Sequence, residues 1–251
     1  MTMTNSNTEA DLLCGIRPLL EAIEAGKELD KIYIQKNLQG ALFKELWGVI
    51  KEHKLPYTVV PKTRLDKFTR KNHQGVIATI SVVQSVDLKE VVQATWEKGE
   101  DPLIVILDRV SDVRNLGAIA RTADAVGAHA LVTTMRNSAA FNMDAMKASA
   151  GALNHLPVCK ESNLNETVTW LQMSGIRVVS CSEKTNQLSY DTDLTGPLAL
   201  IMGSEDKGVA PERIKASDEV VKLPMLGKVG SLNVSVAAGA VLYEIVRQRN
   251  L

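Results

Sequence analysis

The stretch LIVILDRVSDVRNLGAIARTADAVG, residues 103–127, joins an apolar run to a polar loop and then to a helical pattern. Its opening run, LIVIL, is typical of a parallel strand that helices cover on both faces. Asn115, Gly117 and Arg121 open the predicted helix, and Gly127 follows it. This stretch therefore predicts a strand, a loop and a helix of an α/β fold.

Further apolar runs extend this pattern toward the carboxyl terminus. Strands are predicted at 130–133, 177–181, 198–202 and 220–223, and a final helix is predicted at about 234–249. Because continuous apolar runs alternate with helical segments, we expect a parallel sheet with helices on both faces.

Two of these strands also end in glycine-bearing loops. GSEDKGVAP (203–211) follows one run, and PMLGKVGSLNVS (224–235) follows another. Each loop alone has a structural explanation, because Gly forms turns and Ser or Asn caps helices. Ligands of open α/β sheets bind beyond the carboxyl ends of the strands. The three loops together therefore predict one active site, with Asn115, Arg121, Glu205, Ser231 and Asn233 as its catalytic candidates.

The first third of the chain predicts a smaller αβα unit. Helices are predicted at about 15–25, 38–53 and 64–70, and strands at 31–34, 57–60 and 76–83. Residues 84–88, QSVDL, interrupt the pattern and suit a short linker. We therefore expect a disordered polar tail at 1–10, a first domain at 11–83 and a second domain at 89–251.

Charge is balanced over the whole chain and uneven within it. The sequence has 29 basic and 29 acidic residues, so binding of nucleic acid by charge alone is not expected. Residues 51–73 carry an excess of Lys and Arg over Glu52 and Asp66. Such a segment either holds RNA phosphates or forms a solvated helix face, and charge alone leaves both open. The RNA-binding candidates in it are Lys62, Arg64, Arg70 and Lys71.

Several common kinds of site are missing from the sequence. There is no G-x-G-x-x-G turn, and Gly227-Lys228 lacks the flanking residues of a phosphate-binding loop. The histidines lack metal-ligand spacing, so no metal is expected. Cys14, Cys159 and Cys181 lie far apart, which favours a reducing, cytoplasmic compartment. No apolar run reaches the roughly 18 residues of a membrane span, so no membrane partner is expected.

Three motifs resemble those of the SpoU family of RNA ribose 2′-O-methyltransferases, within the SPOUT superfamily. They are NLGAIARTADAVG (115–127), MGSEDKG (202–208) and LPMLGKVGSLNVSVAAG (223–239), in the family's order and spacing. The resemblance extends over essentially the whole chain, because other segments are similar to the members that have an N-terminal RNA-binding domain. Those segments are GIRPLLEAI (15–23), NHQGVIA (72–78) and SAGALNHLPV (149–158). That domain resembles a small ribosomal protein.

The resemblance implies a fold, a cofactor and partners. The methyltransferase domain would contain a trefoil knot and form a homodimer with the active site near the interface. The cofactor would be S-adenosylmethionine, held by Gly203, Leu223 and Leu232, with Met225 and Thr134 nearby. The substrate would be RNA, and the strongest resemblance is to members that methylate a guanosine of 23S ribosomal RNA.

Some residues near the motifs need separate comment. Gly227, Gly230 and Ser231 are compatible with tight threading of a knot or with a simple turn. Val113-Arg114 stands where Pro-His is common before the first-motif Asn, and Asp206-Lys207 replaces a more glycine-rich pair. We count Arg114 as a further RNA-binding candidate.

The family's chemistry assigns Arg121 to activation of the 2′-hydroxyl, helped by the other catalytic candidates. Because a guanidinium stays protonated, it is better suited to binding phosphate and stabilising a developing alkoxide than to acting as a general base. On this interpretation Glu205 orients Arg121, while Ser231 and Asn233 fix the start of the last helix and the substrate.

Three alternative functions remain open. They are a transfer-RNA ribose methyltransferase, a resistance-type enzyme with another ribosomal target, and a non-catalytic RNA-binding or ribosome-assembly factor. The N-terminal domain argues against the first, because the family's transfer-RNA members usually lack it. The intact set of Arg121, Glu205 and Asn233 argues against the last.

Overall fold

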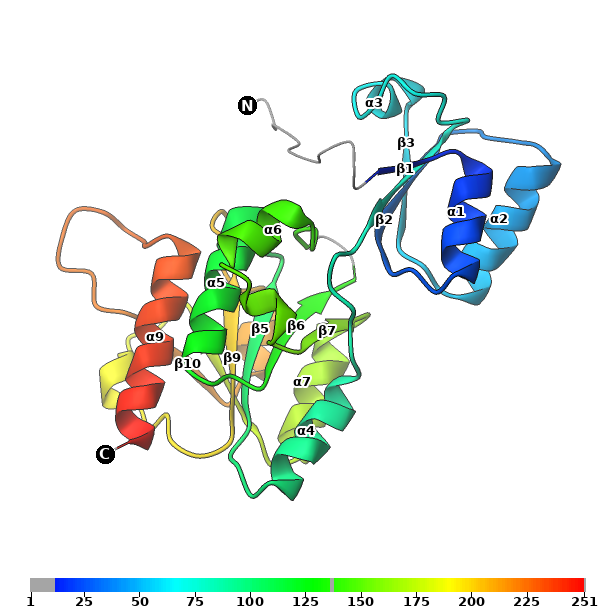
Figure 1. Ribbon diagram of the computed structural model, residues 1–251. Helices are drawn as coiled ribbons and strands as arrows, with labels where there is room; N and C mark the ends of the chain where they lie inside the picture. The colour runs from blue at the N-terminus through cyan, green and yellow to red at the C-terminus, as the bar shows by residue number, and fades with distance from the viewer. Residues whose placement is uncertain (1–11, 136–137, 251) are drawn as a thin grey trace. The chain divides into compact units, whose positions relative to one another are not determined.

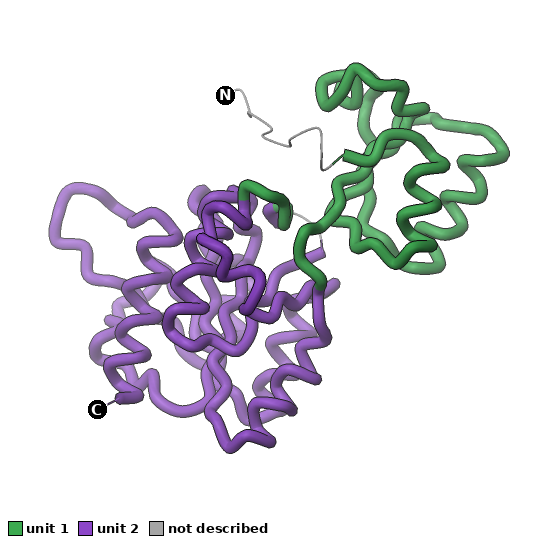
Figure 2. Tube along the Cα trace, viewed as in Figure 1, with its two compact units in different colours: residues 1–84, 140–144 green, residues 85–139, 145–251 purple. Residues whose placement is uncertain are grey.

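The structure is a computed structural model that describes residues 12–135 and 138–250. The polar tail predicted at 1–10 lies outside the described residues. The chain forms two compact units (Figure 2), one of residues 1–84 with 140–144 and one of 85–139 with 145–251. Each unit has its own β-sheet, which we describe separately.

The N-terminal unit is a mixed four-stranded sheet in the order β1-β4-β2-β3. Strand β2 pairs with β3 in parallel and with β4 in antiparallel orientation. The apolar faces of α1 and α2 pack against the sheet and form one core. The elements are β1 (Leu12–Cys14), α1 (Ile16–Glu24), β2 (Leu29–Gln35), α2 (Ala41–Glu52), β3 (Tyr57–Val60), α3 (Lys62–Leu65) and β4 (Val76–Ile80).

Two predicted elements of this unit are wrong in extent, and one strand was missed. The helix predicted at 64–70 is the single turn α3, which starts directly after Pro61. The strand predicted at 76–83 ends at Ile80, because the Ser81 hydroxyl bonds the backbone of Val83 and turns the chain. Strand β1 has only three residues and no alternating pattern that would have predicted it.

The C-terminal unit is a six-stranded sheet in the order β10-β8-β9-β5-β6-β7, and all its neighbouring strands pair in parallel. Its strands are β5 (Leu103–Asp108), β6 (Ala130–Thr134), β7 (Val158–Glu161), β8 (Arg177–Cys181), β9 (Leu198–Gly203) and β10 (Glu219–Val221). Its helices are α4 (Leu88–Glu97), α5 (Val113–Ala125), α7 (Leu164–Met173), α8 (Pro211–Ala216), α9 (Val234–Arg249) and, from Ala145 on, α6 (Met143–Ala148).

Helices cover both faces of this sheet, as the continuous apolar runs predicted. Alternate strand residues such as Ile104 and Ile106 pack with α4 and α7 in one core. Helices α5 and α9 lie side by side (Figure 1) and contribute their buried residues outside that core, so they cover the opposite face. No helix in the described part of the chain is long and apolar enough to cross a membrane. The trefoil knot stays a prediction.

Candidate active site

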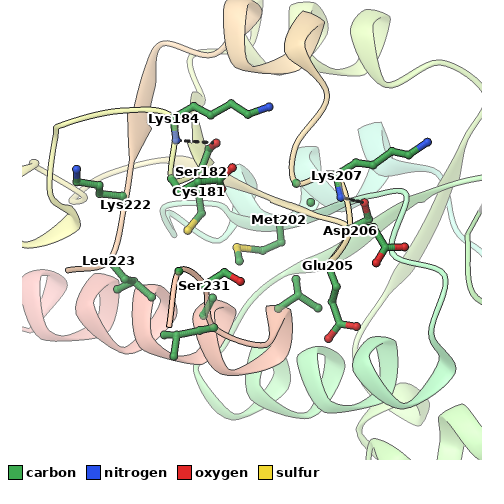
Figure 3. Close-up of a pocket in the computed structure, with 18 of the residues that line it drawn as sticks. Cys181, Ser182, Lys184, Met202, Glu205, Asp206, Lys207, Lys222, Leu223 and Ser231 are labelled. Atoms are coloured by element: carbon green, nitrogen blue, oxygen red, sulfur yellow. Dashed lines mark hydrogen bonds between the residues drawn. The ribbon is translucent and has the colours of Figure 1, made fainter. Parts of the chain in front are cut away.

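The carboxyl ends of the central strands meet at one edge of the C-terminal sheet. Asp108 at the end of β5 is in register with Gly203 at the end of β9, and Val221 of β10 is in register with Cys181 of β8. A cavity of about 680 Å³ opens at this edge (Figure 3). Its size is within the range of about 300 to 1,000 Å³ that small-molecule sites have.

The cavity combines apolar side chains with charged residues and backbone groups. Met202, Leu223, Leu232, Val234 and Ala237 supply apolar surface. The charged residues around it come from three loops and are Glu183, Lys184, Glu205, Asp206, Lys207 and Lys222. An apolar slot bordered by a few directed polar groups suits a planar base joined to a polar, charged chain.

Gly203 lets two backbone segments approach closely at the floor of the cavity. A Cβ atom at this position would lie 2.0 Å from the carbonyl carbon of Gly208 and 2.1 Å from the nitrogen of Val209. Gly208 itself has φ +63°, which side-chain-bearing residues rarely adopt. Its N–H donates to the Ser204 carbonyl at 2.8 Å and closes the loop. Neither glycine can therefore be replaced without moving the loop that carries Glu205.

Asn233 uses both halves of its side-chain amide. Its Oδ1 caps α9 by accepting from the N–H groups of Ser235 at 2.9 Å and Val236 at 3.4 Å. Because the oxygen must face these donors, Nδ2 points the other way, where it donates to Asn115 Oδ1 at 3.0 Å. The same Nδ2 also donates to a carboxylate oxygen of Glu205. Asn233 thus caps a helix through its side-chain oxygen and, through its side-chain nitrogen, links all three predicted loops.

Asn115 is fixed on the opposite side of this link. Asp112 caps α5 and accepts from the N–H groups of Arg114 at 2.7 Å and Asn115 at 3.2 Å. The residue is only 9% exposed, and its Oδ1 is occupied by Asn233. Its Nδ2 has no hydrogen-bond partner among residues 12–135 and 138–250. This amino group is therefore a donor that a bound ligand could use.

Glu205 does not meet Arg121, contrary to the expected pairing. Its hydrogen bond goes to Asn233, and within the described chain it forms no ion pair with Arg121. Arg121 is exposed on α5 and does not line the cavity. The loops therefore bring together the amides of Asn115 and Asn233 with the Glu205 carboxylate, while the guanidinium stays outside this cluster.

The remaining predicted site residues divide into two groups. Ser231 and the cofactor candidates Gly203, Leu223, Met225 and Leu232 all line the cavity, as does Glu205. Thr134 does not line it; this residue ends β6, where its carbonyl accepts from the Ser138 hydroxyl.

A Cβ atom at Gly227 or Gly230 would meet nothing within 4 Å, so crowding does not explain either glycine.

The RNA-binding candidates lie on both units and are all exposed. Lys62 and Arg64 belong to α3, and Arg70 and Lys71 follow it before β4. Arg114 lies in the first turn of α5. RNA binding by these side chains stays a prediction.

Sequence reasoning missed the fourth wall of the cavity, which is the end of β8 and the loop after it. Cys181, Ser182, Glu183 and Lys184 line the cavity. Figure 3 labels Cys181, Ser182 and Lys184 of these. Residues 182–188 contain no glycine, so the composition that drew attention to the other loops is absent there; their place after a predicted strand was the available signal. Burial, with a smaller contribution from Glu183, raises the pKa of the Cys181 thiol to about 11.

No group of three or more His, Cys, Asp or Glu that could hold a metal ion occurs within the described residues. The apolar and charged side chains that line the cavity fit an organic ligand.

Family models match both units of the chain. A model described as the SpoU rRNA methylase family matches residues 102–243. A second model, described as RNA 2′-O ribose methyltransferase substrate binding, matches residues 12–86. Together they cover most of the described chain.

Individual relatives agree with these models. A Bacillus subtilis strain 168 protein, named for the TrmH family of tRNA/rRNA methyltransferases, is 36% identical over 240 residues, which is 96% of each chain. The SpoU methyltransferase AviRb from Streptomyces viridochromogenes, solved with AdoMet, is similar at 27% identity and a TM-score of 0.60, covering 98% of this chain and 93% of its own. The A. aeolicus TrmH/SpoU tRNA modifying enzyme is 32% identical with a TM-score of 0.55, covering 65% of this chain and 84% of its own.

Proposed function

This chain belongs to the SpoU rRNA methylase family, and from that premise we propose that it methylates a ribose 2′-hydroxyl of RNA, most specifically a guanosine of 23S ribosomal RNA. The activity of this family is methylation of RNA with S-adenosylmethionine as the methyl donor. The observation that carries the proposal is the convergence of three loops on one cavity, joined by the Asn233 side chain.

The cavity suits S-adenosylmethionine, whose sulfonium makes its methyl group electrophilic. Met202, Leu223 and Leu232 offer an apolar slot for the adenine, and Gly203 and Gly208 line the cavity with them. Glu183 and Asp206 line the same cavity, and a carboxylate is a suitable acceptor for the hydroxyl and ammonium groups of this cofactor. The described residues therefore provide both the shape and the directed polar groups that such a ligand needs.

The protein's task in such a transfer is alignment and charge stabilisation. Asn233 holds Glu205 and Asn115 in one arrangement, and the free Nδ2 of Asn115 can orient a substrate oxygen. Arg121 is exposed and cationic, so it can approach the ribose or its phosphate from outside the cavity and stabilise negative charge on the 2′-oxygen. Residue roles of this kind require no metal.

Two properties of the surface support the partners implied by the family. Val236 and Tyr243 on α9 are 56% and 58% exposed, which is a large apolar exposure for one helix and supports a homodimer. In such a dimer the exposed Arg121 could serve the site of either copy. The basic side chains around α3 support a role for the N-terminal unit in holding RNA.

The extent of the structural matches favours ribosomal RNA over transfer RNA. The A. aeolicus tRNA enzyme covers 65% of this chain, and a structure described for 2-OH methylation of C/U34 on tRNA covers 59%. The SpoU methyltransferase AviRb covers 98% of it. These two tRNA-modifying structures leave a third or more of this chain unmatched, whereas a family model for RNA 2′-O ribose methyltransferase substrate binding matches its residues 12–86.

Mapping of 2′-O-methyl groups in total RNA, with and without the gene, tests the substrate. We expect one guanosine of 23S ribosomal RNA to lose its methyl group, with transfer RNA unchanged. A lost methyl group in transfer RNA would instead establish the alternative. A titration with S-adenosylmethionine separates both enzymes from a non-catalytic assembly factor, which would show no binding.

A further inference from the structure

Asp108 and Arg109 form a buried contact behind the loop that carries Glu205. Asp108 is 0% exposed at the end of β5, and its Oδ2 accepts from the N–H of Ala210 at 2.7 Å. Its Oδ1 lies 3.3 Å from Arg109 Nε and 3.8 Å from Arg213 Nε. These three atoms have no hydrogen-bond partner within the described residues, so charge alone joins them. A carboxylate this buried would be strongly destabilising without cations beside it.

Arg109 also reaches the loop itself. Its Nη2 donates to the Gly208 carbonyl at 3.2 Å. Gly208 lines the cavity and closes the loop through its bond to Ser204. The planar guanidinium therefore contacts the buried carboxylate with one nitrogen and the loop with another, a fixed fork that the single nitrogen of a lysine does not reproduce.

The backbone of Arg109 indicates that this contact has a function beyond packing. Its φ is +63°, a left-handed conformation that is costly for a residue with a long side chain. Glycine would adopt this conformation freely, yet the sequence has arginine. Strain of this kind persists only where the surrounding structure enforces it, and it clusters at ligand-binding and active sites.

The pair also connects two of the predicted loops. Arg109 lies three residues before Asp112, which caps the helix that carries Asn115. Its other contact, Gly208, ends the loop that carries Glu205. A shift of the Asp108 and Arg109 side chains would therefore move the loop at Gly208 relative to the start of α5.

We propose that Asp108 and Arg109 are positioning residues that hold the Ser204–Gly208 loop in the conformation that binds S-adenosylmethionine. This inference rests on the function proposed above. Neither residue lines the cavity, so each acts through the loop and not by touching the cofactor.

The test compares Arg109→Gly, Arg109→Lys and the wild-type chain in titrations with S-adenosylmethionine, next to thermal unfolding of the same samples. Arg109→Gly relieves the backbone strain, so a residue with a purely structural role would leave cofactor affinity unchanged. We expect the dissociation constant to rise about tenfold or more, since a charge-assisted hydrogen bond to the loop is lost. Lys54→Gly removes a cationic side chain from another residue of positive φ, in the N-terminal unit, and should leave the titration unchanged.

Arg109→Lys keeps a cation beside Asp108 and so protects the fold if Arg109→Gly melts early. Lysine lacks the rigid two-nitrogen fork, so we expect an affinity between those of the wild type and Arg109→Gly. If Arg109→Gly is folded and binds S-adenosylmethionine as tightly as the wild type, the inference is overturned. If Arg109→Gly unfolds, the same result in Arg109→Lys overturns it. If the wild-type chain binds S-adenosylmethionine but makes no 2′-O-methyl group, the proposed function fails, while the binding comparison still decides the role of Arg109.

Discussion

The side-chain amide of Asn233 donates to Asn115 Oδ1 at 3.0 Å across 118 positions of the sequence, and so joins the first turns of α9 and α5. The orientation of the Asn233 amide is set by its helix cap, because the oxygen faces the N–H groups of Ser235 and Val236. Local capping therefore determines a long-range contact in the active site.

Asn233→Ser separates these two roles. Serine caps helices about as well as asparagine, so the free energy of unfolding should stay within about 0.5 kcal/mol of the wild-type value. The serine hydroxyl is too short to bridge Asn115 and Glu205, so methyl transfer should fall about tenfold to a hundredfold. Asn233→Ala, which also loses the cap, should unfold about 1 kcal/mol more easily. Full transfer activity in Asn233→Ser would show that the bridge is dispensable.

Gly203→Ala and Gly227→Ala form a matched pair. The new methyl group at Gly203 would overlap the backbone of Gly208 and Val209, whereas at Gly227 it meets nothing within 4 Å. We expect Gly203→Ala to lose about 1 to 3 kcal/mol of stability and most of its cofactor affinity. Gly227→Ala should resemble the wild type in urea unfolding and in titrations with S-adenosylmethionine. Equal behaviour of the two variants would mean that the close approach at Gly203 is unimportant.

Much of this site could be predicted because its elements carry local signals. The apolar runs at 103–107, 177–181 and 198–202 coincide with strands, and 234–249 is a helix at the predicted bounds. Contacts that depend on the tertiary fold could not be predicted. Glu205 was expected to orient Arg121, yet its carboxylate, just after the end of β9, accepts a hydrogen bond from Asn233.

The β8 loop shows the same limit. Only the strand order, which no local pattern determines, places Cys181 between β9 and β10 at the cavity.

Cys181 offers a pH-dependent probe of the cavity. With its pKa raised to about 11, its thiolate fraction at neutral pH is about two orders of magnitude below that of an ordinary cysteine. Alkylation by iodoacetamide, followed by peptide mass spectrometry, should therefore be slow at pH 7.5 and accelerate as the pH rises toward 11. Because Cys181 lines the cavity, S-adenosylmethionine should slow it further. Rapid labelling at neutral pH, unaffected by cofactor, would contradict this placement.

Neutralising the basic side chains near α3 tests the role of the N-terminal unit. Replacing Lys62, Arg64, Arg70 and Lys71 by alanine in the full chain should weaken RNA binding and lower the slope of log affinity against log salt by about 3. Cofactor affinity should not change. Lys98→Ala, in the other unit, is the control and should leave the salt dependence intact. An unchanged slope in the quadruple variant would remove these residues from the RNA contact.

Transfer of a labelled methyl group to RNA, with the product cleaved by alkali, tests the central claim most directly. A 2′-O-methyl group protects the adjacent phosphodiester, so label from wild-type protein should appear in alkali-resistant dinucleotides. Arg121→Ala should bind S-adenosylmethionine normally and transfer methyl groups about a hundredfold to a thousandfold more slowly. Label on a base, or wild-type transfer by Arg121→Ala, would contradict a site in which converging loops and this arginine direct a methyl group to a ribose oxygen.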